Sequence, residues 1–82
     1  MREDNIQAVI ALVADVLGVQ KDELGPDSSM ENTPLWDSVE HMDICLAFER
    51  RFGVALDMDT IAAAVSIRSL TAKVPSGWTT KP

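Results

Sequence analysis

Over the first eighteen residues, apolar side chains recur at spacings of three and four, a pattern that predicts an amphipathic helix with one face toward a core. This face consists of Ile6, Val9, Ile10, Val13, Val16 and Leu17. Asp4 or Asn5 is expected to cap the start of the helix, because both side chains accept hydrogen bonds from free helical N–H groups. Gly18 is placed to end it, since glycine readily adopts the left-handed conformation that follows many helices.

Between residues 20 and 36 the helical period disappears, and turn-forming pairs such as Gly25-Pro26 and Thr33-Pro34 take its place. A long loop is therefore predicted, and a short helical turn at residues 21–24 is compatible with the pattern. Long loops in small domains commonly have a function. The residues expected to anchor this loop to the helices are Leu24, Met30, Leu35 and Trp36.

A second helix is predicted from about Ser38 to Arg51, because Asp37 is a favourable N-cap and Glu40 follows three residues later, as in a capping box. Two apolar stripes run along this helix. The stripe expected to face the core consists of Ile44, Phe48 and Phe52, with Cys45 beside them. The second stripe consists of Val39, Met42 and Leu46. A chain this short has little else to cover both stripes, so the second is expected to meet a partner; a nearly engulfed helix is the alternative.

Gly53 is expected to end the second helix, and two further helices are predicted at residues 60–64 and 67–74. Their caps and stop signals are Asp57 or Asp59 before the third helix, Ser66 before the fourth and Pro75 after it. The apolar residues expected to point inward here are Val54, Leu56, Ile67, Leu70 and Val74.

These elements predict an all-α fold: a small four-helix bundle with three longer helices, one short helix and a long loop between the first two. A length of 82 residues allows one small domain, and a composition that is 46% hydrophobic but only 5% aromatic favours a core of aliphatic side chains. Residues 1–75 are assigned to the domain. Residues 76–82 lack periodicity and are expected to form a disordered tail.

The formal net charge is −6, from 13 acidic and 7 basic residues, which disfavours nucleic acid and anionic membranes as partners and favours basic protein surfaces. The plainer reading is that the charge only maintains solubility. One cysteine allows no internal disulfide, and we find neither a transmembrane-length apolar run nor a signal peptide. A cytoplasmic monomer without membrane insertion is expected.

The sequence holds two constellations of reactive side chains, and neither is sufficient for catalysis or metal binding. His41 and Cys45 lie four residues apart on the second helix, but a metal would need two further ligands. Ser38 and His41 could be neighbours, as in a small hydrolase, but such a site also needs an orienting acid, an oxyanion hole and a pocket. His41 is therefore expected to be exposed on the partner-facing side, Cys45 to be a small core residue, and no residue to be catalytic.

Ser38 itself follows an acidic cap at the start of a helix, a position that presents its hydroxyl to solvent near the positive end of the helix dipole and suits a phosphodiester. The alternative is that Ser38 simply begins a helix. The stretch from Trp36 to Leu56, with Asp37-Ser38-Val39 near its start and Phe48-Glu49-x-x-Phe52-Gly53-Val54 near its end, resembles the attachment-site helix of acyl carrier proteins. The resemblance extends over roughly Ile6 to Val74.

In that family, the serine of an Asp-Ser-Leu motif bears 4′-phosphopantetheine, whose thiol holds a cargo as a thioester. The resemblance implies that Ser38 is the attachment residue and that Asp37 belongs to the motif and caps the helix. It further implies a partner-recognition face formed by Val39, Glu40, Met42, Asp43, Leu46 and Glu49. The implied partners are a phosphopantetheinyl transferase, an acyl- or aminoacyl-loading ligase, and a downstream synthase or transferase.

The chain also departs from the fatty-acid type of carrier. Val39 replaces the usual leucine, and the acidic residues of the second helix alternate with His41, Arg50 and Arg51. The preceding Pro34-Leu35-Trp36 resembles free-standing carriers of specialised pathways. Fatty-acyl, polyketide and aminoacyl cargoes therefore remain open. A helical interaction domain with the same fold and no prosthetic arm is the alternative function.

Overall fold

The computed structural model describes residues 3–75 and 77–78, and these residues form four α-helices and one 3₁₀ turn. The elements are α1 (Glu3–Leu17), η1 (Lys21–Glu23), α2 (Ser38–Phe52), α3 (Met58–Ala63) and α4 (Ile67–Thr71). This arrangement confirms the all-α prediction and the helical turn near residue 21. The prediction of three longer helices was wrong, because α1 and α2 have 15 residues each whereas α3 has six and α4 has five.

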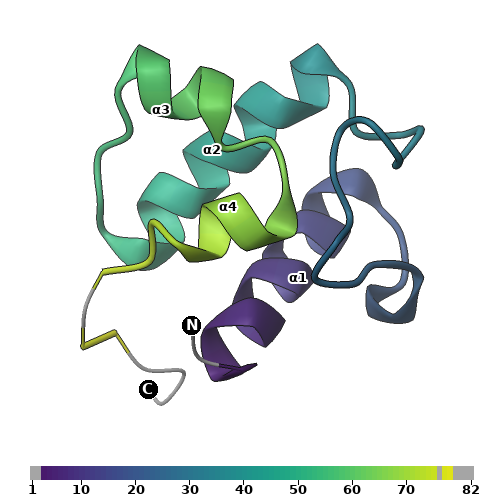
Figure 1. The fold of residues 1–82 in the computed structure, drawn as a ribbon, viewed down its shortest axis with the longest axis horizontal. Coiled ribbons are helices and arrows are strands. Elements are labelled where there is room, and N and C mark those ends of the chain that lie inside the picture. The colour runs from purple at the N-terminus through teal and green to yellow at the C-terminus, as the bar shows by residue number, and fades with distance from the viewer. Residues whose placement is uncertain (1–2, 76, 79–82) are drawn as a thin grey trace.

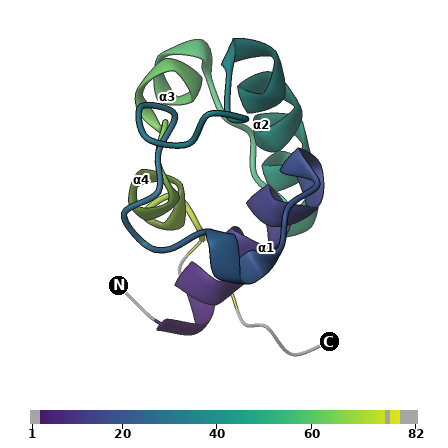
Figure 2. The same ribbon diagram turned by 90° about the vertical axis from the view of Figure 1, so that its right-hand side faces the viewer.

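The helices enclose a single apolar interior. α1 packs against both α2 and α4, and Figure 1 shows α2 passing behind α4 while α3 lies at the top. Viewed from the side, the four helices and the long loop surround a common centre (Figure 2). The buried residues that fill it are Val9, Ile10, Val13, Trp36, Ile44, Phe48, Phe52, Ala64, Ile67 and Leu70. Among the residues described, no helix has both the length and the apolar character needed to cross a membrane.

The helix boundaries follow local capping. Gly18 ends α1 with a φ of 73°, as predicted, but the helix begins at Glu3, so Asp4 and Asn5 lie inside it rather than capping it. A cap must precede the first helical residue, so the prediction placed the start of α1 too late. Gly53 ends α2 in the left-handed conformation, also as predicted.

The two short helices also differ from the predicted ranges. α3 begins at Met58, because the cap is Asp57, whose Oδ1 accepts a hydrogen bond from the Thr60 N–H at 2.8 Å. That hydrogen bond lowers the pKa of the Asp57 carboxyl. α4 is capped by Ser66 as predicted but ends at Thr71, before the predicted end at residue 74. The chain tightens there into i→i+3 hydrogen bonds, since proline 75 disfavours helical geometry in the residue before it.

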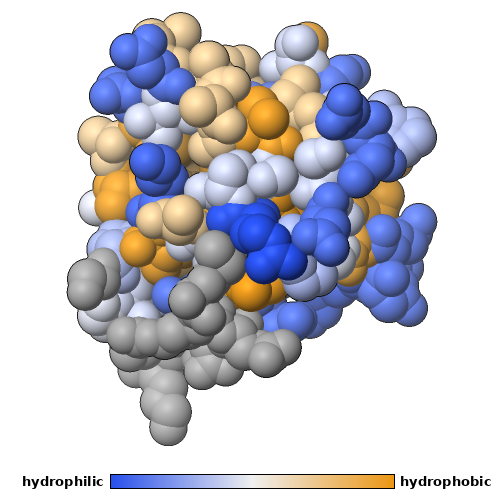
Figure 3. Space-filling view, in the orientation of Figure 1, coloured by the Kyte–Doolittle hydropathy of each residue, from blue (hydrophilic) through white to orange (hydrophobic). Residues whose placement is uncertain are grey.

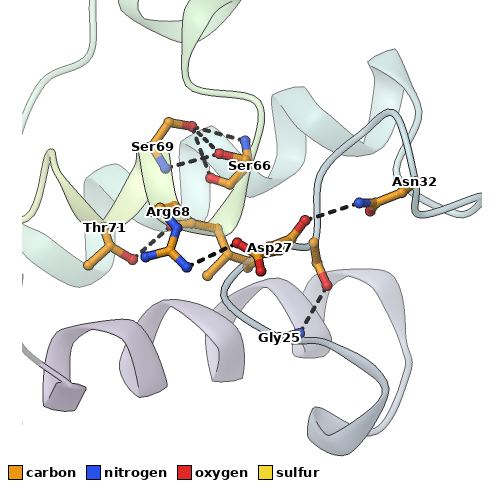
Figure 4. Close-up of polar contacts among 9 residues, drawn as sticks. Gly25, Asp27, Asn32, Ser66, Arg68, Ser69 and Thr71 are labelled. Carbon is orange, nitrogen blue, oxygen red and sulfur yellow. Dashed lines mark hydrogen bonds and ion pairs between the residues drawn. The ribbon is translucent and has the colours of Figure 1, made fainter.

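The long loop is fastened to α4 by polar contacts (Figure 4). Arg68 Nη2 forms an ion pair with Asp27 Oδ1 at 2.9 Å, and the Ile67 N–H donates to the Ser28 carbonyl at 2.9 Å. An antiparallel bridge joins Ser29 of the loop to Ser66, the residue that caps α4. The loop is therefore an ordered part of the fold and delivers the chain to the start of α2.

Three of the four predicted loop anchors contact the core. Trp36 is only 1% exposed, and Leu24 and Met30 pack against the core while partly buried. The prediction for Leu35 was wrong, because its side chain is 57% exposed. Leu35 and Trp36 are adjacent in a tight turn, and the larger indole takes the buried position.

Trp78 adds an aromatic contact at the end of the described chain. Its ring centroid lies 4.6 Å from that of Phe52, and the Arg51 guanidinium lies 5.0 Å from the Trp78 centroid. The sequence prediction missed this contact, because the residues after 75 show no helical periodicity. Of the predicted tail, residues 76 and 79–82 lie outside the described residues, and the domain boundary at residue 75 stays a prediction.

Candidate functional site

Ser38 is the first residue of α2, and its side chain is exposed. Asp37 precedes it as the N-cap in extended conformation, and Asp37 Oδ1 accepts a hydrogen bond from the Glu40 N–H at 2.9 Å. The Asp37 N–H donates to the Leu35 carbonyl at 3.2 Å and not to the Glu40 side chain, so only half of the predicted capping box forms. The cap fixes the backbone around Ser38 while leaving its hydroxyl free of hydrogen bonds within the described residues.

This position suits an anionic substituent on the serine oxygen. The N–H groups of Ser38 and Val39 belong to the first turn, where a helix provides no internal acceptors. Together with the helix dipole, they form a positive environment beside the hydroxyl. The exposed hydroxyl, the capped backbone and the free N–H groups therefore fit attachment of a phosphodiester.

An exposed apolar surface adjoins Ser38. The exposed fractions are 70% for Val39, 43% for Met42 and 48% for Leu46, which confirms that the second stripe of α2 lies outside the core. Leu35 from the loop and Met58 from α3, which is 70% exposed, are the other large exposed apolar side chains of the described residues. We call these five residues, which are candidates for contact with a partner, the docking face. Figure 3 shows apolar and hydrophilic side chains next to one another on the upper part of the molecule, and mostly hydrophilic ones on the right-hand side, where the loop lies.

Met58 was not among the predicted site residues. It directly follows the Asp57 cap, so it occupies the first position of α3 as Ser38 does in α2. An apolar residue at the first position of a short capped helix could have indicated exposure, but the helix start had been predicted two residues later.

The acidic residues predicted for partner recognition have different surroundings. Asp43 is exposed, whereas Glu40 and Glu49 are half-buried. Glu49 Oε2 accepts a hydrogen bond from the Leu56 N–H at 2.7 Å, so this carboxylate holds the connection between α2 and α3. Among the three, Asp43 presents the most accessible charge.

His41 was predicted to be exposed, and that prediction was wrong. Its side chain is only 5% exposed, the Trp36 Nε1–H donates to its Nδ1 at 3.0 Å, and its Nε2 lies 2.7 Å from the Ile61 carbonyl oxygen. The residue lies three positions before Ile44 and seven before Phe48, so it continues the core stripe. Burial is tolerated because both ring nitrogens have hydrogen-bond partners.

This arrangement does not form a hydrolase dyad. Both nitrogens of His41 are occupied by Trp36 and Ile61, so neither is free to take a proton from Ser38. Cys45 is buried, and burial, followed by the charge of Glu49, raises the pKa of its thiol. Within the described part of the chain, no three His, Cys, Asp or Glu residues are grouped so that they could hold a metal ion.

Comparisons with known proteins give the family of this chain. Residues 7–74 match the family model described as "Phosphopantetheine attachment site". A protein named acyl carrier protein from Petrotoga mobilis is 30% identical over 74 residues, an alignment that covers 83% of this chain and 87% of that protein. The match thus extends through all the described helices after the first turn of α1. This chain belongs to the acyl carrier protein family, whose prosthetic group is covalently attached 4′-phosphopantetheine.

Proposed function

We propose that Ser38 bears the 4′-phosphopantetheine and that the protein carries acyl or aminoacyl intermediates to partner enzymes in the cytoplasm. The observation that carries this proposal is the exposed Ser38 hydroxyl at the capped start of α2, beside the exposed apolar stripe. The prosthetic group supplies a flexible arm with a terminal thiol that holds cargo as a thioester. The protein itself catalyses no step.

The roles of the chain's own residues follow from their positions. Asp37 fixes the turn that presents the Ser38 oxygen to a phosphopantetheinyl transferase, which must approach this oxygen closely. Val39, Met42 and Leu46 provide apolar area for the transferase, a loading ligase and a downstream synthase or transferase. Asp43, with Glu40 and Glu49 nearby, and the net charge of −6 attract basic partner surfaces and accelerate association at low salt.

The cargo class is left as acyl, polyketide-type or aminoacyl, in fatty-acid, polyketide or another specialised biosynthesis. The mixed charge of α2 supports a specialised pathway, because Arg50 and Arg51 in its last turn reduce the negative character of the helix. Identification of the loading enzyme would decide the cargo directly.

Intact mass after reaction with coenzyme A and a broad-specificity phosphopantetheinyl transferase tests the proposal. We expect the wild-type protein to gain one phosphopantetheinyl group and Ser38→Ala to gain none. The variant should stay folded, with a loss of at most about 1 kcal/mol in unfolding free energy, because Asp37 still caps α2. An unchanged wild-type mass would contradict the proposal and favour an interaction domain that uses the same docking face without an arm.

A further inference from the structure

A buried hydrogen-bonded bridge joins three segments next to the candidate site. The Trp36 indole at the end of the loop donates to His41 Nδ1 in the first turns of α2 at 3.0 Å. His41 Nε2 in turn reaches the Ile61 carbonyl of α3 at 2.7 Å, twenty residues further along the chain. The side chains of Trp36 and His41 are 1% and 5% exposed, so the hydrogen bond between them is shielded from water, and the one to Ile61 is partly buried.

The partners fix the tautomer of the imidazole. An indole N–H can only donate and a backbone carbonyl can only accept, so Nδ1 of His41 must be the acceptor and Nε2 must carry the proton. No other side chain of similar size offers an acceptor and a donor at these two positions in one rigid ring. The bridge therefore specifies histidine at position 41.

The bridge compensates for the weak attachment of α3. None of the six residues of α3 is fully buried, so the helix contributes little to the core. The Ile61 carbonyl lies in the last turn, where helical carbonyls lack internal partners, and the Val65 N–H that would reach it donates to Ala63 instead. The His41 Nε2–H donates to this carbonyl and thereby links the end of α3 to α2.

We infer that the Trp36–His41–Ile61 bridge is a positioning element that holds the docking face in a single arrangement, an inference that rests on the proposed function. The five residues of the face come from the three segments that the bridge connects: Leu35 from the loop, the stripe from α2 and Met58 from α3. A partner that binds only the assembled face loses apparent affinity in proportion to the fraction of molecules in which α3 has moved.

Two substitutions of His41 each remove one of the two hydrogen bonds of the bridge. In His41→Asn, the amide oxygen can occupy the place of Nδ1 and accept from Trp36, but nothing reaches Ile61. In His41→Gln, the longer side chain places an amide N–H near the position of Nε2 and can donate to Ile61, but the bond to Trp36 is lost. Val13→Ala is the matched control for general destabilisation, because Val13 is fully buried and lies on α1, which contributes no residue to the face.

The structural readouts are amide hydrogen exchange and the indole N–H resonance of Trp36, assigned with Trp36→Phe. In His41→Asn, we expect the α3 amides to exchange about tenfold faster, the effect of losing roughly one hydrogen bond's free energy, while α1 is unchanged and the Trp36 indole stays protected. In His41→Gln, α3 should keep its protection and the Trp36 indole should lose it. Val13→Ala should accelerate exchange throughout the protein without selecting α3.

The functional readout is the kinetics of phosphopantetheinyl transfer to the apo form, with the carrier as the varied substrate. We expect His41→Asn to raise KM by the factor by which the fraction of molecules with α3 docked falls, about tenfold if α3 is displaced in roughly nine of ten molecules. The kcat should stay nearly unchanged, because Ser38 is still capped by Asp37. His41→Gln should raise KM less, and Val13→Ala should leave both constants near the wild-type values.

Two results would overturn the inference: α3 exchange in His41→Asn equal to that of the wild type, or an unchanged KM although exchange shows that α3 is displaced in a large fraction of the molecules. A wild-type protein that gains no mass would instead refute the proposed function. The exchange of the α3 amides would then be the only test of whether the bridge holds α3 in place, because that measurement needs no partner enzyme.

Discussion

The two sides of α2 carry apolar residues of similar kind but serve different purposes. On one side, Ile44 and Phe48 are fully buried and Phe52 is 4% exposed. On the other side, Val39, Met42 and Leu46 are 43–70% exposed, and the exposed Ser38 lies at the end of this stripe. Hydrophobic side chains close the core on one side, whereas on the other side they stay exposed, and we propose that partners bind there. The comparison shows that periodicity alone reports where apolar residues lie but not what covers them.

The buried side should respond strongly to loss of volume, and Phe48→Ala is the largest effect we expect. Phe48 is 0% exposed and lies 4.5 Å from Phe52 between ring centroids. Truncation should lower the unfolding free energy by about 3–5 kcal/mol, a large share of the stability of a domain this small. Denaturant unfolding followed by circular dichroism measures it. A variant as stable as the wild type would mean that Phe48 does not belong to the core.

The exposed side should respond in function and not in stability. In Met42→Glu the new carboxylate would point to water from a side chain that is already 43% exposed, so the helical signal should stay near wild type. Phosphopantetheinyl transfer or downstream transfer should slow by about tenfold or more, because a charge would be pressed into an apolar contact. The helical signal and the transfer rate are measured on one preparation.

The outcomes for Met42→Glu separate the two sides of the helix. Unfolding would place Met42 in the core, and full activity with every partner would remove it from the docking face. Ile44→Glu is the matched control, since it introduces the same carboxylate two residues away on the buried side and should prevent folding.

Much of this organisation could be predicted from the sequence because it depends on local chemistry. The periodic core residues, the Asp37 cap and the Gly53 stop are properties of short segments, and the structure confirms them. The exposure of the second stripe could also be predicted, because a short chain cannot cover two faces of one helix. The helix resemblance identified the family that the comparisons then showed.

The errors concern residues whose surroundings come from distant parts of the chain. His41 appeared to be an exposed polar residue, since its partner Ile61 lies twenty positions away and its burial depends on a contact between two helices. Leu35 and Trp36 looked equivalent as anchors, and only tertiary packing decides which of two neighbours enters the core. Tertiary pairing of this kind leaves no periodic signal in the sequence.

Cys45 provides the smallest and most specific test of the buried side. Burial and the charge of Glu49 raise the pKa of its thiol, so the reactive thiolate is scarcer in the folded protein than in the unfolded chain. Iodoacetamide should therefore label Cys45 in the folded apo protein at least about tenfold more slowly than in urea. After modification, the arm should add one fast-reacting thiol in the folded state, which intact mass distinguishes from Cys45.

The same raised pKa makes a prediction about stability. A thiol whose folded pKa lies above the ordinary value of 9.0 favours the folded state below that value, and this contribution disappears as the pH rises through the higher folded pKa. The unfolding free energy of the wild type should therefore fall more steeply above pH 9.0 than that of Cys45→Ala, which has no thiol to ionise. Parallel pH profiles for the two proteins, together with rapid labelling of Cys45 in the folded state, would place this residue on the accessible side of α2, and the division of the helix into a core side and a docking side would no longer hold at that position.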